Sequence, residues 1–203
     1  MPLKLAVFQP TILAMDEVPP NIYSKIFSLT ENLHSFVSTS DTTNMSGGHY
    51  ATVYPDESLN TKWLIDWIES ICQNYMDLIS TQSSSEDLKY CKPVVTDIRT
   101  LRQYENDYVE MYTHVGSHIS GNVYVQVPEL DANSKPTDSQ ALFRMPQTKD
   151  ITKFIMNDTL KFIPRQATMI LFPSHVPNTL YPWRGTGYRT ILSFNTILRP
   201  KDE

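Results

Sequence analysis

The sequence predicts a mainly β protein (α+β) in which two N-terminal helices cover one outer face of a β-sandwich or barrel. In residues 1–90, two stretches repeat apolar residues at spacings of three and four, which is typical of amphipathic helices. From Pro93 onward, short runs of Val, Ile, Tyr and Phe are broken by turns, which is typical of an all-β half. No linker separates the halves, so we expect a single domain over residues 1–203, with an N-terminal strand and the helices in 1–90 and the β core in 91–203.

Composition narrows the class of protein. Hydrophobic residues make up 40% of the 203 residues, which suffices for a buried core. The net charge is -5 and the 17 basic residues are scattered, so we expect no nucleic-acid partner. The longest apolar runs fall short of the roughly 18 residues of a membrane span, so we expect no membrane partner. Cys72 and Cys91 lie in unlike contexts without CxxC spacing, which favours free thiols and a reducing compartment such as the cytoplasm over a disulfide.

The N-terminal elements are predicted from the spacing of apolar residues and from the positions of Pro and polar residues. Residues 3–14 read as two short extended pieces interrupted by Pro10, and residues 16–20 as a turn. Apolar stripes predict helices over residues 21–37 and 59–80, the second being the stronger. Between them a polar loop leads to a predicted strand at 50–54.

The β half contains seven predicted strands. They cover residues 94–101, 108–113, 120–127, 141–145, 161–163, 168–172 and 188–198. Residues 130–140 are a polar loop, whereas residues 148–158 fit a short helix or a further strand. The last two strands are the most apolar, and the loop between them is dense in Pro, Asn, Trp and Gly.

Four side chains of this half could carry chemistry. His114 and His118 flank a Val-Gly-Ser segment, and His175 follows Phe-Pro-Ser in the loop between the two most apolar strands. They are either loop histidines bonded to backbone or ligands of one metal. Arg189 opens an apolar strand, where it is either an edge residue or a bidentate clamp for a small carboxylate.

Several motifs resemble the 2-oxoglutarate and Fe(II)-dependent oxygenases, specifically a branch with many proteins of tailed phages. The motifs are MYTHVGSHISGNVYVQVPEL at 111–130, LFRMP at 142–146, FPS at 172–174 and RTILSFN at 189–195. The resemblance implies a double-stranded β-helix, that is, a jelly-roll barrel with its active site in the mouth. It also implies Fe(II) and 2-oxoglutarate as cofactors of an active member.

Carried over by position, the family's site matches this chain unevenly. The 2-oxoglutarate arginine falls on Arg189, and the SFN ending of its strand supplies Ser193 and Asn195. Of the three iron-ligand positions, one falls on His114, whereas Tyr112 and Asn178 occupy the other two. A phenol with a pKa of about 10 and a neutral amide are weak iron ligands. In a rescue arrangement, His118 or His175 would replace the missing donors.

Three functions remain open at this point. The first is a pseudoenzyme, an oxygenase-like jelly roll with a degenerate iron site and neither iron nor 2-oxoglutarate. It would be a binding or structural component with protein partners, in the cytoplasm or a tailed-phage virion. Aromatic residues of the mouth loop would then fill or cover the old site, namely Trp183, Tyr181 and Tyr188. The second is an active 2-oxoglutarate-dependent dioxygenase, a hydroxylase with non-standard histidine ligands. The third is an unrelated jelly roll that binds sugar or protein through loop aromatics.

Overall fold

The computed structural model describes residues 12–36, 49–54, 60–83, 87–144 and 159–201. Two long helices, α1 (Pro20–Phe36) and α2 (Lys62–Ser83), are followed by the short 3-10 helix η2 (Asp87–Tyr90). The strands are β1 (Ala14–Glu17), β2 (His49–Tyr54), β3 (Cys91–Gln103), β4 (Val109–Tyr112), β5 (Ile119–Gln126), β6 (Glu129–Leu130), β7 (Ala141–Arg144), β8 (Thr159–Phe162), β9 (Thr168–Pro173), β10 (Asn178–Leu180), β11 (Gly185–Thr186) and β12 (Arg189–Pro200).

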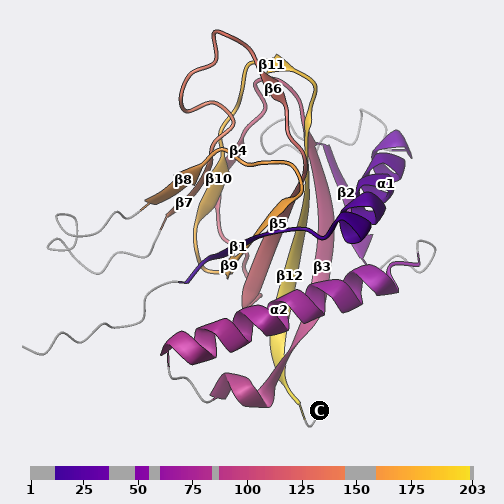
Figure 1. Ribbon diagram of the computed structural model, residues 1–203, viewed down its shortest axis with the longest axis vertical. Coiled ribbons are helices and arrows are strands. Elements are labelled where there is room, and N and C mark those ends of the chain that lie inside the picture. Colours follow the sequence, from indigo (N-terminus) through magenta and orange to yellow (C-terminus); the bar gives the residue numbers. More distant parts are fainter. Residues whose placement is uncertain (1–11, 37–48, 55–59, 84–86, 145–158, 202–203) are drawn as a thin grey trace, which may run out of the picture.

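Two antiparallel sheets face each other and form the barrel. The larger has the order β1-β9-β5-β12-β3-β2 and the smaller the order β4-β10-β7-β8, while β11 and β6 form a separate pair. Both long helices lie against the larger sheet, on the side away from the smaller one (Figure 1). The predicted jelly roll with two helices on its outer face is therefore confirmed.

The side chains of β12 point alternately to two apolar clusters on opposite faces of the larger sheet. Leu192 and Phe194 face the helices and belong to the larger apolar cluster, which includes Ile26 of α1 and Ile68 of α2. Ile191 faces the smaller sheet and joins the inner cluster. Because successive side chains of a strand point to opposite faces, the odd-numbered residues Arg189 to Asn195 line the barrel interior. The sequence of this one strand thus serves the helix interface and the candidate site at once.

Close packing on the helix side requires a glycine at one position of β5. Gly121 pairs with Phe194, whose ring lies directly over it. A Cβ built at residue 121 would stand 2.2 Å from Cζ of Phe194 and 2.8 Å from Cδ2 of Leu171. Glycine is therefore the residue that lets the Phe194 ring lie flat on the sheet.

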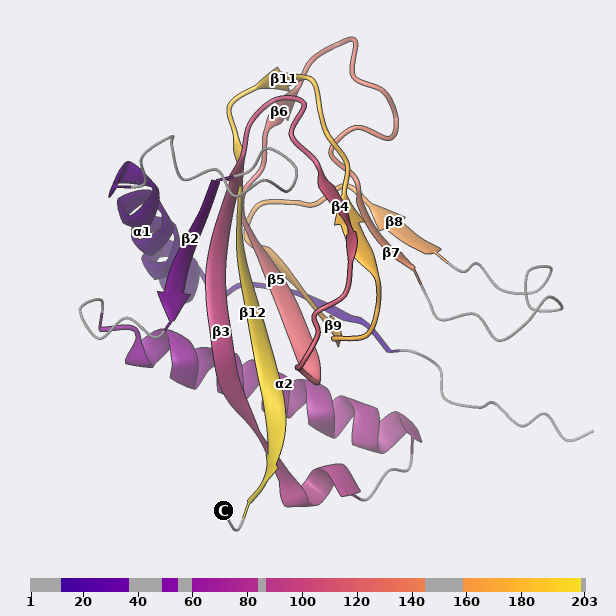
Figure 2. The same cartoon turned by 180° about the vertical axis from the view of Figure 1, so that it is seen from behind.

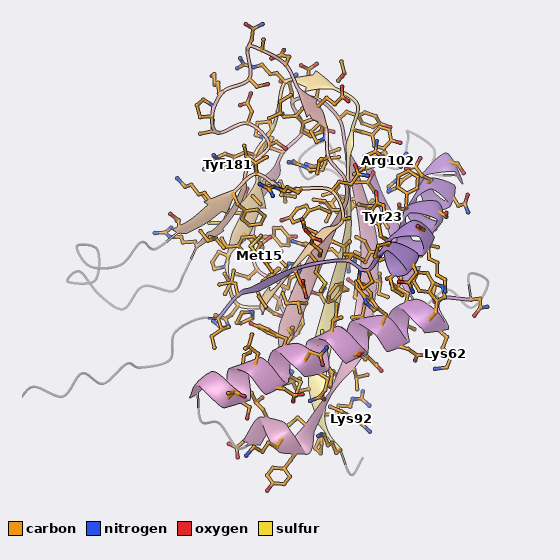
Figure 3. The ribbon with its side chains drawn as sticks, in the orientation of Figure 1. Met15, Tyr23, Lys62, Lys92, Arg102 and Tyr181 are labelled. Atoms are coloured by element: carbon orange, nitrogen blue, oxygen red, sulfur yellow. The ribbon has the colours of Figure 1, made fainter. Side chains whose placement is uncertain are left out.

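A second set of polar contacts joins α1 to the larger sheet. Arg102 of β3 pairs with Glu31 of α1, and its guanidinium stacks 4.1 Å from the ring centroid of Tyr188. Tyr23 of the same helix donates a hydrogen bond to the carbonyl of Val125 at 2.9 Å. Figure 3 shows Tyr23 and Arg102 at this junction of helix and sheet.

Most predicted elements are found, and the described residues differ from the prediction at β1, at three short strands and at the 3-10 helix η2, which was not predicted. Residues 14–17 form β1 instead of leading into a turn, since their backbone pairs with β9 from Ala14↔Leu171 to Glu17↔Thr168. An edge strand accepts the polar Asp16 and Glu17, because one of its sides faces water. The short strands β6, β10 and β11 were not predicted. The predicted extended pieces up to residue 11 and the segment 148–158 lie outside the described residues, and the single-domain division stays a prediction.

Two further observations concern the cysteines and the helices. Cys72 is buried and Cys91 partly buried, and both are free thiols as predicted. Among the described helices, none is long and apolar enough to cross a membrane.

Candidate functional site

Arg189 lies inside the barrel, where its side chain is fully buried. Its Nε and Nη2 donate to Oε1 of Gln103 at 3.0 and 2.9 Å. Nη2 also donates to the Tyr181 carbonyl at 3.1 Å, and Nη1 to the Ser139 carbonyl at 3.4 Å. The guanidinium carbon lies 4.9 Å from the centroid of the Trp183 ring. All three nitrogens of the guanidinium are thus held by neutral acceptors of the protein itself.

The surroundings of Arg189 are poor in compensating negative charge. Burial lowers the pKa of the Arg189 guanidinium to about 10, while Tyr124 and Asp107 act in the opposite direction. Three buried groups around it, Nε2 of Gln103, the Tyr124 hydroxyl and Nε1 of Trp183, have no hydrogen-bond partner among the described residues. Gln103 and Trp183 contact the guanidinium, and Tyr124 interacts with its charge. The inner end of the barrel is therefore polar, and Gln103 and Trp183 pack there against the guanidinium.

His114 follows β4 at the other end of this interior face. Its backbone N–H donates to the Ser174 carbonyl at 2.9 Å, and its ring lies between Tyr112 and Phe172, with centroid distances of 4.9 and 5.5 Å. Burial lowers the pKa of His114 to about 4, while a hydrogen bond between its ring and Asn195 and the charge of Asp97 act in the opposite direction. The imidazole is therefore neutral at pH 7. Its Nε2 is buried and has no partner among the described residues.

Tyr112 and Asn178 sit opposite each other, because β4 and β10 pair antiparallel in the register Asn178↔Tyr112. Nδ2 of Asn178 is 3.5 Å from the Tyr112 carbonyl and 3.4 Å from the Val176 carbonyl, both of which accept from it. Although 39% of Tyr112 is exposed, its hydroxyl end is buried beside Ser193, and this burial raises the pKa of the phenol to about 12, so the phenol is protonated at pH 7. The fold thus gathers the three predicted ligand positions Tyr112, His114 and Asn178 on neighbouring strands, but supplies one imidazole, one neutral phenol and one amide.

Ser193 and Asn195 belong to hydrogen-bonded chains across the sheet. Ser193 Oγ donates to Oδ1 of Asn122 at 2.5 Å. Asn195 accepts from Ser120 Oγ at 2.7 Å and donates through Nδ2 to Asp97 at 3.3 Å. These contacts engage both side chains within the protein.

The remaining predicted ligands point elsewhere. His118 is exposed, and its Nδ1 accepts the backbone N–H of Leu198 at 2.8 Å. His175 is exposed as well. In the part of the chain that the structure describes, no three His, Cys, Asp or Glu side chains gather as a metal site requires. The structure therefore does not bring His118 and His175 to His114, and their role as ligands stays a prediction.

Sequence reasoning missed the groups that hold Arg189. Gln103 and Ser139 lie 86 and 50 residues from it along the chain, so no local motif marks them. The pairing Arg189↔Gln103 at the ends of β12 and β3 brings the first of them into place. Trp183, by contrast, was predicted to fill the mouth, and its side chain is buried against the guanidinium.

Known proteins resemble this chain in sequence motifs and in fold. The family model described as "Putative 2OG-Fe(II) oxygenase" matches residues 99–195. No curated protein matches the sequence. Among solved structures, a prolyl-4-hydroxylase of Pseudomonas putida matches with a TM-score of 0.60 at 9% identity, covering 92% of this chain and 93% of that one. A prolyl hydroxylase of Trichoplax adhaerens, in complex with a peptide fragment of hypoxia inducible factor, matches with a TM-score of 0.61 at 12% identity, covering 91% and 83%.

A third match is the viral collagen prolyl hydroxylase of Paramecium Bursaria Chlorella virus-1 in its 2OG complex, with a TM-score of 0.54, 12% identity and coverage of 91% and 94%. At such identities these structures establish the fold. Together with the family model they confirm the resemblance to 2-oxoglutarate and Fe(II)-dependent oxygenases, whereas the tailed-phage branch stays a prediction.

Proposed function

We propose that this chain, whose fold is that of the 2-oxoglutarate and Fe(II)-dependent oxygenases, is a non-catalytic binding or structural protein built on an oxygenase barrel. The observation that carries the proposal is the side-chain chemistry at the three positions where the family places its iron ligands. Tyr112, His114 and Asn178 stand there, and the first two are in ring contact. The cytoplasm and a tailed-phage virion remain the two predicted settings.

The residues present do not fit Fe(II). Iron of this class is held by neutral imidazoles and a carboxylate with open positions beside them. His114 supplies a suitable neutral imidazole. The Tyr112 phenol, with its pKa raised to about 12, would first have to ionise in a buried setting, and the Asn178 amide is a weak donor. One good ligand of three does not make an iron site.

The residues present also do not fit 2-oxoglutarate. A carboxylate clamped by Arg189 would need the two parallel N–H groups that guanidinium forks offer to carboxylates. Oε1 of Gln103 already accepts from Nε and Nη2, which form that fork. The Tyr181 and Ser139 carbonyls engage the remaining nitrogens. Gln103 therefore occupies the Nε/Nη2 fork through which Arg189 would clamp a carboxylate.

Titration of the purified protein with Fe(II) and 2-oxoglutarate tests this proposal. We expect no saturable binding of either at micromolar concentrations and no succinate. The double variant Tyr112→His with Asn178→His is the matched gain-of-ligand control, and it should bind a divalent metal such as Co(II) more tightly than the wild type. Micromolar binding of both cofactors by the wild type, with succinate released, would refute the proposal.

One observation favours a second candidate, an active dioxygenase with non-standard ligands. Nε2 of His114 is buried without a partner among the described residues, as expected of a nitrogen that awaits a metal. His118 or His175 would then have to approach it. Co(II) absorption spectra of the wild type and of His114→Ala decide between the candidates, since only a metal site built on His114 gives a spectrum that the substitution abolishes.

A further inference from the structure

The segment from Tyr104 to Val115, which contains β4, exposes an unusual share of the large apolar side chains. Ten such side chains are exposed among the described residues, and five of them lie in these 12 positions. They are Tyr104, Tyr108, Met111, Tyr112 and Val115, with exposed fractions of 46, 46, 46, 39 and 93%. Single exposed apolar residues need no explanation, whereas five along one short segment are a reason to look for an interaction surface there.

β4 is also an open edge. Within the described residues it pairs only with β10, so its other side has no strand beside it. Figure 2 shows β4 at the border of the smaller sheet, facing the viewer between the two sheets. Glu110, Met111 and Tyr112 are all exposed, although successive side chains of a strand point to opposite faces. The strand is thus accessible from its edge and partly from both faces.

The charge of the segment defines what would bind to it. Residues 104–115 contain Glu105, Asp107 and Glu110 and neither Lys nor Arg. Glu105 and Asp107 precede β4 and accept the backbone N–H groups of Gly185 and Tyr104, whereas Glu110 is exposed on β4 itself. Natural edge strands are commonly protected from pairing by Lys or Pro, and this segment has neither. An added strand with basic residues would complement the acidic groups, while its apolar residues would cover Met111 and Val115.

We propose that β4 and its flanks form the docking surface for an extended, basic segment of a partner protein, which adds as a strand to the smaller sheet. Backbone hydrogen bonds to the free edge would provide affinity, and the acidic side chains would select the partner. The inference rests on the binding role proposed above and names the class of its partner. The docking surface involves neither Arg189 nor a metal. A failure of the peptide experiment below would therefore contradict the docking surface alone, whereas a failure of the cofactor titration would contradict the non-catalytic role.

The test follows amide resonances of 15N-labelled protein during addition of a capped peptide of sequence KVKIKVK. Two peptides serve as controls, one with Glu for each Lys and one N-methylated on alternate residues, which cannot form the ladder. We expect shifts confined to residues 104–115 with the basic peptide, and binding about tenfold weaker or absent with either control.

Two charge reversals complete the experiment. Glu110→Lys should weaken binding of the basic peptide about fivefold. Glu17→Lys makes the same change on β1, an edge strand of the larger sheet where Glu17 is exposed, and should leave binding unchanged. Equal binding of the acidic or N-methylated peptide, shifts elsewhere in the protein, or equal effects of the two reversals would overturn the proposal. So would shifts of residues 104–115 that depend on protein concentration alone, since a second copy of the chain would then occupy the edge.

Discussion

The substitution Arg189→Met tests whether Arg189 stabilises the fold or is retained to bind a cosubstrate. The substitution preserves much of the side-chain volume but removes the donors to Gln103, Tyr181 and Ser139. Each buried acceptor left without a donor costs about 1 kcal/mol or more, so three acceptors suggest a loss of about 3 kcal/mol. Relief of the desolvated charge offsets part of this, and we expect a net loss of about 1–3 kcal/mol.

Urea unfolding followed by circular dichroism measures the change in the free energy of unfolding, and thermal unfolding measures the change in Tm. For a chain of this length, a loss of about 3 kcal/mol corresponds to a decrease in Tm of about 6–12 °C. Arg165→Met is the matched control, because Arg165 is exposed, and its effect should stay within about 0.5 kcal/mol.

The opposite sign would refute the reasoning. An arginine kept for an absent carboxylate would be a buried charge without its counterion, and its removal would leave the protein equally or more stable. In that case, 2-oxoglutarate at 100 times its Kd would stabilise the wild type by about 2.7 kcal/mol. We expect no shift of Tm on adding 2-oxoglutarate.

Three further predictions concern single residues. The pKa of His114 is lowered from 6.5 to about 4, so between these pH values the unfolded chain binds a proton that the folded chain does not. The free energy of unfolding should therefore fall by about 2–3 kcal/mol as the pH decreases from 6.5 to 4. Urea unfolding at several pH values should show this slope and its reduction in His114→Gln; an unchanged slope would assign it to other groups. Gly121→Ala should destabilise by about 1–3 kcal/mol in thermal unfolding because its Cβ meets the Phe194 ring, and a neutral result would mean that the ring moves freely. Burial raises the pKa of the Cys72 thiol to about 12, so a thiol reagent should modify Cys91 alone in the native protein; rapid reaction of two thiols would contradict the buried position.

Periodicity predicted the long elements well. The apolar stripes of α1 and α2 and the runs of β3, β5, β9 and β12 are long enough for spacing to identify them. β10 was not predicted because it spans only Asn178–Leu180, directly after Pro177, in a loop rich in turn residues. Such a short strand forms because β4 and β7 on either side supply hydrogen bonds, which no local pattern reveals.

For the candidate site, the sequence predicted which residues lie together but not which hydrogen bonds they form. Tyr112, His114 and Asn178 were expected to share a site, and the pairing of β4 with β10 does bring Tyr112 opposite Asn178. That Gln103 accepts from Nε and Nη2 of Arg189 depends on the register of two strands about 86 residues apart in sequence. Register is set by the packing of the whole sheet, so it lies beyond motif analysis.

The place of β12 between β5 and β3 has a consequence for biosynthesis. β12 is the last described strand to be made, yet it fills the centre of the larger sheet. At 5–20 residues per second, roughly 5–20 s pass between the synthesis of β3 and that of β12. During this time β3 and β5 cannot join, and each presents an open edge to other nascent chains. The protein should therefore depend on chaperones during translation more than a sheet assembled in sequence order would.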